Sequence, residues 1–238
     1  MPCPDAVKNM NVVDCVFGVT NFWDPSVGYD GEIRQCRNLA DACKRVGIKH
    51  LVYSTLDRNS DVPHFQSKVE GEDYMRSLGL PLTCLCTSFY FENFTLFFPP
   101  KFDNNGCVFS VAQKPTTCVP MYSVNDTGGW VCEIFKHPEL YLNKDVGTVG
   151  EYITYPELVA TYTRVTGIPA VFNQVSLDAF RNAGFPGAEE LAANLKFFDD
   201  LSDGIKKDRR VCIEDCNRIW DGGENWEHYL RRTEWTGK

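Results

Sequence analysis

The chain has 238 residues and a formal net charge of −8, and 43% of its residues are hydrophobic. This length can bury the core of one large domain or of two small ones. The acidic charge argues against a general binder of nucleic acids or anionic membranes, because both functions need a basic surface. The one basic cluster, Lys206–Arg210, is typical of a solvated loop or helix end.

The N-terminus and the cysteines indicate a cytoplasmic or nuclear protein. Met1–Asp5 lacks the charged start and apolar core of a signal peptide. The most apolar window, Leu78–Pro100, is interrupted by Ser88, Glu92, Asn93 and prolines, so it cannot span a bilayer. The 11 cysteines show no paired spacing of the kind that binds zinc. We therefore expect reduced thiols, no membrane contact and no metal site.

The first part of the chain alternates between strands and helices. Apolar runs predict inner strands of a parallel sheet over Asp14–Val19, Lys49–Thr55 and Leu82–Ser88. Helical spacing of apolar residues predicts helices over Gly31–Val46 and His64–Leu78, each followed by a glycine that ends it. This alternation predicts the α/β class with a Rossmann-like doubly wound parallel sheet.

From about Lys101 the predicted elements become shorter and more mixed. The expected strands are Cys107–Val111, Thr117–Met121, Val146–Ile153 and Ala170–Val175, and the expected helices are Gly129–Lys136, Pro156–Thr166, Leu177–Asn182, Ala188–Asp199 and Asn225–Arg232. We therefore predict two parts. Residues 1–100 form a partial NAD(P)-binding Rossmann-like domain, and residues 101–238 form a smaller α+β C-terminal region.

A complete dinucleotide-binding fold begins with a strand and a G-x-G-x-x-G loop that holds the pyrophosphate. The sequence contains no such loop, and Met1–Val12 is too short for a strand and a helix. We therefore expect an N-terminally truncated sheet that lacks its first three strands, on the order of 60–80 residues at ~30 per βα unit. The strand at Val13–Val19 would then be an exposed edge.

Polar and aromatic residues follow the predicted strands at the edge where such sheets bind ligands. After the first strand, Thr20 and Asn21 would bond a nucleotide while Phe22 packs against it; a plain strand end is the alternative. After the third strand, Ser88–Phe94 is either a hinge between the two parts or a contact on the nicotinamide side.

His64 and Lys68 are one helical turn apart on the same face. A short-chain dehydrogenase carries Tyr-x-x-x-Lys at such a place, where the Lys holds the ribose and the Tyr donates the proton. Here His64 stands in place of the Tyr. The alternative is a solvated lysine beside a histidine in the cap region of the helix.

The segments Thr20–Trp23, Pro63–Lys68, Phe89–Asn93 and Gly184–Ala188 together resemble the NmrA-like family in order and spacing. The likeness runs from about Asp14 to the C-terminus. It implies an atypical short-chain dehydrogenase fold that binds NADP(H), has lost the catalytic Tyr and acts as a redox sensor and regulator.

The resemblance also implies a set of cofactor contacts. They are Thr20, Asn21, Phe22, Arg34, Lys68, Tyr90, Phe91, Glu92 and Asn93. No catalytic residue is implied. The glycine-rich loop and the basic residues that read the 2′-phosphate are absent from this sequence, so NADP binding is expected to be weak or lost.

Three functions remain open at this stage. The first is a non-catalytic NADP(H)-responsive redox sensor that regulates through protein partners, with a homodimer as a further option. The second is an NAD(P)H-dependent reductase in which His64 or a water donates the proton. The third is a scaffold that binds no nucleotide.

Overall fold

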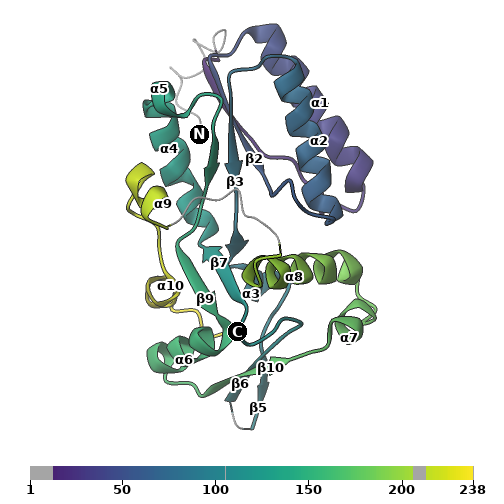
Figure 1. Ribbon diagram of the computed structural model, residues 1–238. Coiled ribbons are helices and arrows are strands. Elements are labelled where there is room, and N and C mark those ends of the chain that lie inside the picture. Colours follow the sequence, from purple (N-terminus) through teal and green to yellow (C-terminus); the bar gives the residue numbers. More distant parts are fainter. Residues whose placement is uncertain (1–12, 105, 206–212, 238) are drawn as a thin grey trace, which may run out of the picture.

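The computed structural model describes residues 13–104, 106–205 and 213–237. The segment Met1–Val12 and the basic cluster Lys206–Arg210 lie outside the described residues. Figure 1 shows a main sheet with its helices above a second group of strands and helices. No helix in the described ranges is long and apolar enough to cross a membrane.

The main sheet confirms the predicted parallel arrangement. It is a 4-stranded sheet in the order β1-β2-β3-β8, and each neighbouring pair is parallel. Its strands are β1 (Cys15–Gly18), β2 (His50–Thr55), β3 (Leu82–Cys86) and β8 (Asp145–Gly147). Every residue of β2 and β3 is buried, as expected for inner strands covered on both faces.

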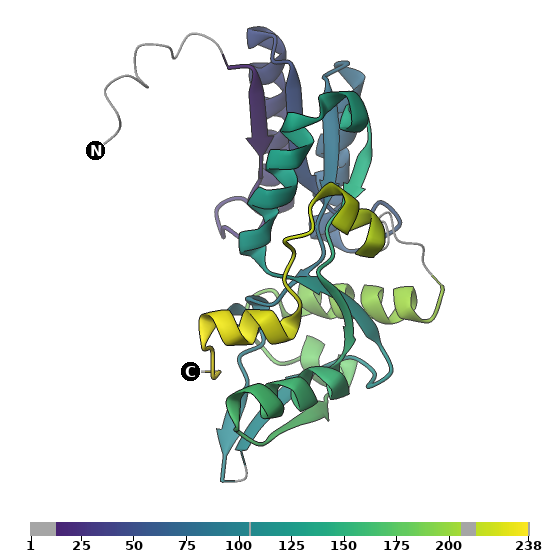
Figure 2. The same cartoon turned by 90° about the vertical axis from the view of Figure 1, so that its left-hand side faces the viewer.

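Helices cover both faces of this sheet (Figure 2). On one face lie α1 (Gly28–Val46) and α2 (Pro63–Ser77), and on the other lies α4 (Thr127–Lys136), with α5 (Pro138–Tyr141) and α9 (Ile213–Ile219) beside it. Helices α1 and α2 pack closely because Gly71 has no side chain. A Cβ atom there would lie 2.4 Å from the Sγ atom of Cys36.

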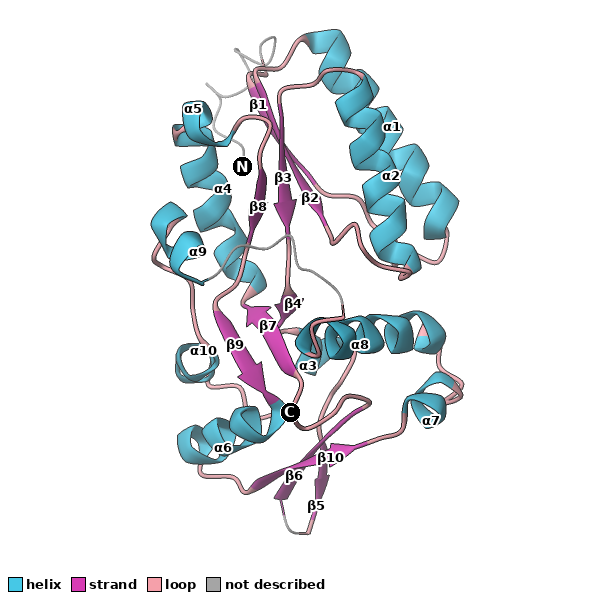
Figure 3. Cartoon of the chain, in the orientation of Figure 1, coloured by secondary structure: helices cyan, strands magenta, loops and turns pink. Residues whose placement is uncertain are grey.

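The second part contains two small sheets, visible as separate groups of arrows in Figure 3. One has the order β4-β7-β9 and the other β10-β6-β5. Their strands are β4 (Phe89–Tyr90), β5 (Lys101–Asp103), β6 (Gly106–Val111), β7 (Cys118–Tyr122), β9 (Glu151–Thr154) and β10 (Ala170–Gln174). The helices are α3 (Asn93–Leu96), α6 (Tyr155–Thr166), α7 (Leu177–Arg181), α8 (Ala188–Ser202) and α10 (Trp226–Thr233), with a 3-10 turn at Val124–Asp126.

The core of the second part is aromatic. Trp226 is fully buried and its ring lies 5.3 Å from that of Phe91 and 5.6 Å from that of Phe94. Helix α6 starts with a capping box, in which the side chains of Thr154 and Glu157 each accept a backbone N–H of the other residue. The helix predicted over Asn225–Arg232 is confirmed by α10.

One predicted strand was wrong in its extent. The run Val146–Ile153 is two strands, β8 in the main sheet and β9 in a second sheet. Between them Gly150 passes so close to the backbone that a Cβ would lie 2.2 Å from the carbonyl oxygen of Glu224. The division near residue 100 stays a prediction, and β8 shows that residues beyond it also contribute to the main sheet.

Strand β1 is an edge of the main sheet, because within the described residues it pairs only with β2. Apolar side chains are open to solvent here: Phe17 of β1 is 40% exposed, and Val19, directly after the strand, is 61% exposed. An apolar strand edge of this kind favours pairing with another chain.

We therefore expect the isolated chain to self-associate, and we expect Phe17→Lys to weaken the association, since a lysine on an edge strand opposes pairing. Sedimentation velocity over a range of concentrations would measure this. Leu140→Lys is the matched control, because Leu140 is 57% exposed on α5, away from this edge. Equal association of both variants and the unmodified chain would contradict the role of β1.

Candidate functional site

A cavity of about 380 Å³ lies at the carboxyl ends of β1, β2 and β3, with α8 on its far side. Figure 1 shows α8 and α3 directly beyond these strand ends. Most of the lining residues are apolar, and many are aromatic. They are Val19, Thr20, Asn21, Phe22, Trp23, Ser54, Leu56, His64, Phe65, Lys68, Thr87, Ser88, Phe89, Tyr90, Glu92, Asn93, Leu96, Phe97, Phe98, Val124, Leu191, Asn194 and Phe198.

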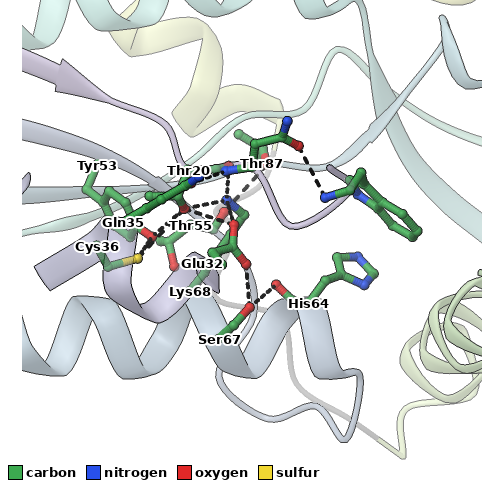
Figure 4. A network of polar contacts seen from close by, with 12 residues as sticks. Thr20, Glu32, Gln35, Cys36, Tyr53, Thr55, His64, Ser67, Lys68 and Thr87 are labelled. Carbon is green, nitrogen blue, oxygen red and sulfur yellow. Dashed lines mark hydrogen bonds and ion pairs between the residues drawn. The ribbon is translucent and has the colours of Figure 1, made fainter. Parts of the chain in front are cut away.

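Lys68 faces the cavity but is held by a buried carboxylate. Its Nζ lies 2.9 Å from Oε1 of Glu32, and the Glu32 side chain is fully buried. The same Nζ donates to the carbonyl oxygen of Thr20 at 3.0 Å. The hydroxyl groups of Thr20 and Ser67 both donate to Glu32 (Figure 4). The alternative of a solvated lysine is therefore wrong, since the Lys68 side chain is only 12% exposed.

The network continues into the main sheet through neutral groups. The hydroxyl of Tyr53 lies 3.1 Å from Oγ1 of Thr20 and 2.8 Å from Sγ of Cys36. Burial raises the pKa of both Tyr53 and Cys36. The two residues therefore stay protonated at neutral pH, and the charges of this cluster are those of Lys68 and Glu32.

His64 is buried and bonded across the cavity to α8. Its Nδ1–H and its backbone N–H both donate to Oε1 of Glu190, the latter at 2.8 Å. Its ring lies 5.7 Å from that of Phe22, 5.1 Å from that of Trp23 and 4.8 Å from that of Phe65. Burial lowers the pKa of His64 more than Glu190 raises it. Neutral His64 with Nδ1 protonated leaves Nε2 as a hydrogen-bond acceptor and not as a proton donor.

The loop after β1 is shaped by side-chain bonds to its own backbone. The N–H of Trp23 donates to Oδ1 of Asn21 at 3.2 Å, and the N–H of Asn21 donates to Gln35 at 2.9 Å. The Trp23 ring lies 5.3 Å from the ring of Phe97. It also reaches Gly187, where an added Cβ would lie 3.2 Å from the indole and where φ is +85°.

Among the predicted residues after β3, Tyr90, Glu92 and Asn93 line the cavity. The carboxylate of Glu92 accepts from the hydroxyl of Ser123 at 2.8 Å and from the N–H of Val124 at 3.0 Å. Glu92 therefore holds one wall of the cavity in place.

Two predicted contacts do not reach the cavity. Phe91 is fully buried against Trp226 and Tyr229, because it points to the opposite side of the chain from Tyr90. Arg34 is exposed on α1 and does not line the cavity. The inward residues of this helix are Glu32 and Cys36, and a residue two positions away points to the other side.

Sequence reasoning missed Glu32 and the residues of α8. Glu32 had a usable signal, because it lies on the apolar face of α1, four positions before Cys36 and eight before Ala40. A charged residue on such a face indicates a buried ion pair. Glu190 and Asn194 carried no comparable signal, because their contacts lie far away in the chain.

A second polar cluster lies where α2 meets β3 and β8 of the main sheet, and it has a structural role. Side-chain atoms of Glu72, Cys84 and Asp145 lie within 4.8 Å of one another, as ligands of a metal would. Guanidinium groups already occupy this position: Arg58 lies 2.6 Å and Arg76 3.0 Å from Glu72, and Arg76 lies 2.6 Å from Asp145. The cluster is thus neutralised by arginines, which leaves little reason for a bound cation.

We expect Lys68→Met to destabilise the fold by about 3–5 kcal/mol, because it leaves the Glu32 carboxylate buried without a counter-charge. The double variant with Glu32→Gln should regain most of this loss, since both charges are then removed. Urea unfolding would measure it. A double variant no more stable than Lys68→Met alone would contradict the dependence on the ion pair.

A second expectation concerns pH. His64 has a lowered pKa in the folded state, so below its ordinary value of 6.5 the unfolded chain binds more protons than the folded one. The contribution of His64 to stability is therefore present above pH 6.5 and is lost as the pH falls below it. His64→Asn keeps a donor near Nδ1 but does not titrate. Melting temperatures from pH 7.5 to 5 should fall more steeply for the unmodified chain than for this variant. Parallel curves would contradict a lowered pKa of His64 in the folded state.

The curated proteins similar to this chain include one named as a repression protein and one named as an oxidoreductase. An NmrA-like family domain-containing protein of Dictyostelium discoideum is 28% identical over 181 residues, 69% of this chain and 59% of the relative. The nitrogen metabolite repression protein nmr of Neurospora crassa is 25% identical over 232 residues, 85% of this chain and 46% of the relative. An NmrA-like family domain-containing oxidoreductase of Aspergillus flavus is 27% identical over 183 residues, 71% of this chain and 55% of the relative. The chain spans about half the length of these relatives.

The fold is also similar to solved structures. NmrA, described as a negative transcriptional regulator, in complex with NAD matches with a TM-score of 0.75 at 23% identity, over 92% of this chain and 73% of that one. Its complex with NADP matches with a TM-score of 0.74 at 21% identity. At these identities the likeness establishes the Rossmann-like fold. The family model described as NmrA-like family matches residues 5–230, and the chain therefore belongs to the NmrA-like family.

Proposed function

We propose that this chain is a non-catalytic regulatory protein that responds to NAD(P)(H) and acts through protein partners in the cytoplasm or nucleus. One observation carries the proposal. The two ionisable side chains best placed for chemistry in the cavity are both engaged, Lys68 with Glu32 and His64 with Glu190. The cavity therefore offers surfaces for binding but no ready proton donor at the position of the dehydrogenase Tyr.

The cavity fits one end of a nicotinamide coenzyme better than the other. Phe22, Tyr90 and Asn93 offer aromatic faces and a carboxamide for a nicotinamide ring, which in its reduced form would supply a hydride. For the phosphates the lining residues offer one lysine, Lys68, whose charge is balanced by Glu32. We therefore propose that these residues hold the nicotinamide end and that affinity for the whole coenzyme is weak.

The relatives support the regulatory role. NmrA is described as a negative transcriptional regulator, and its complexes contain NAD or NADP. The Neurospora relative is named as a nitrogen metabolite repression protein. A regulator of this type needs only a difference in coenzyme affinity between two states of its partner complex.

An NAD(P)H-dependent reductase is the second candidate, favoured by the relative named as an oxidoreductase. In this chain His64 would have to be protonated before it could donate, and burial opposes this. A nucleotide-independent scaffold is the third candidate.

We expect NADPH to bind this chain with a dissociation constant weaker than the low micromolar range. The sequence contains no glycine-rich loop to donate backbone N–H groups to the pyrophosphate. Loss of several such charge-assisted hydrogen bonds, at ~1.5–3 kcal/mol each, weakens a micromolar site by orders of magnitude. Calorimetry with NADPH, NADP and NADH would measure this, and a low micromolar constant would contradict the expectation of weak binding.

The same protein should show no NADPH oxidation above background with a panel of quinones and carbonyl compounds. Phe185→Ala is the control variant for His64→Asn, because Phe185 is exposed and does not line the cavity. Steady turnover that His64→Asn abolishes and Phe185→Ala preserves would favour the reductase. Absence of all binding, even at millimolar coenzyme, would favour the scaffold.

A further inference from the structure

We propose that Asp126 and Glu151 form a proton-dependent clasp on the C-terminal helix α10, and that the clasp opens more readily as the pH rises from 5 to 7.5. Both carboxylates bind the backbone at the start of this helix. The inference stands apart from the proposed function, because it needs neither a coenzyme nor a protein partner.

The chain is bonded at two points where it enters α10. Oδ2 of Asp126 accepts the N–H of Glu224 at 2.8 Å, and Oε2 of Glu151 accepts the N–H of Trp226 at 2.8 Å. Asp126 belongs to the 3-10 turn after β7, and Glu151 belongs to β9, which lies beside α10 in Figure 3. The two carboxylates therefore hold the start of α10 against two separate elements.

Negative charge is crowded around Asp126, which is only 8% exposed. The charged groups that face it are Glu224 before α10, Arg232 on α10 and Glu92 on the cavity wall. The guanidinium of Arg232 already donates to both carboxylate oxygens of Glu224. Three carboxylates thus share one guanidinium, an arrangement that favours the binding of a proton by one of them.

The proton is expected on Asp126 when α10 is closed. Burial, together with the charges of Glu224 and Glu92, raises the pKa of Asp126 to about 6, although the N–H of Glu224 and the charge of Arg232 oppose the shift. When α10 opens, Asp126 returns to water and toward its ordinary pKa of 3.8. Between these two values the closed state binds more protons than the open state, so the free energy of opening falls as the pH rises toward 6.

Glu151 adds a second contribution of the same sign. Burial raises its pKa, and the charged groups that face it are Glu157 of α6 and Glu227 and His228 of α10. The proton that Glu151 binds more tightly in the closed state is also lost as the pH rises.

The clasp also reaches the cavity. Nη2 of Arg232 donates to Oγ of Ser123 at 3.4 Å, and this hydroxyl donates to Glu92, which lines the cavity. Opening of α10 therefore removes one support of the cavity wall.

Hydrogen–deuterium exchange of the full chain at pH 5 and pH 7.5 tests the clasp. Protection factors, corrected for the pH dependence of intrinsic exchange, would be compared between residues 229–232 of α10 and the helix α1. The protection of α10 should fall about tenfold from pH 5 to pH 7.5, as expected when opening lowers a pKa from about 6 to 3.8. The protection of α1 should not fall, and His64 acts in the opposite direction, since its contribution to stability is present above pH 6.5.

Asp126→Asn keeps an oxygen acceptor for the N–H of Glu224 but does not titrate, so it should remove most of the fall. Glu151→Gln in the same chain should remove the remainder. Glu224→Gln should reduce the fall, because it removes a like charge beside Asp126. Asp178→Asn is the matched control and should preserve the tenfold fall, since the Asp178 side chain is 86% exposed on α7.

Equal protection of α10 at both pH values in the unmodified chain would overturn the inference. A fall that α1 shares would also overturn it, because that result reports unfolding of the whole chain. If Asp126→Asn fails to fold, the unmodified chain and Glu224→Gln decide the question, and a fall that Glu224→Gln leaves unchanged counts against the clasp. A failure of NADPH to bind bears on the proposed function alone.

Discussion

The buried ion pair between Lys68 and Glu32 is the interaction on which the candidate site depends. It joins α2 to α1 and, through Thr20, to the end of β1. Two charges can be withdrawn from water only when each satisfies the other and the remaining lone pairs and protons are bonded. Thr20 and Ser67 complete that requirement, so the position of the loop after β1 is linked to the packing of α1 against α2.

A second polar link sets the opposite wall of the cavity. His64, one turn before Lys68 on α2, is bonded to Glu190 of α8, which joins the main sheet layer to the second part of the chain. The polar groups near the strand ends are thus used largely for structure, and aromatic surface is left facing the cavity. Relatives on this fold are described both as regulators and as oxidoreductases, so the fold alone does not decide between them.

The sequence predicted the elements that depend on local pattern. The runs of β2 and β3 are buried at every position, and Gly47, with φ of 69°, ends α1 as expected. It was wrong where a partner distant in the chain decides the outcome. Phe91 is aromatic and adjoins Tyr90, which lines the cavity. Its ring nevertheless packs against the aromatic rings of α10 in the core of the second part.

The sequence by itself determined the parallel sheet, its helices and the family, because strand and helix periodicities are properties of consecutive residues. It also indicated a ligand edge where the predicted strands end, since carboxyl ends of parallel strands share one edge, and the family resemblance put Thr20 and Lys68 in one set of cofactor contacts. Only the tertiary structure decided what these residues do there. Glu32 and Glu190 hold Lys68 and His64 through contacts that bridge up to 126 residues of chain. Hydrogen bonds and burial depend on distance in space, and no local pattern records which distant side chain will supply the partner.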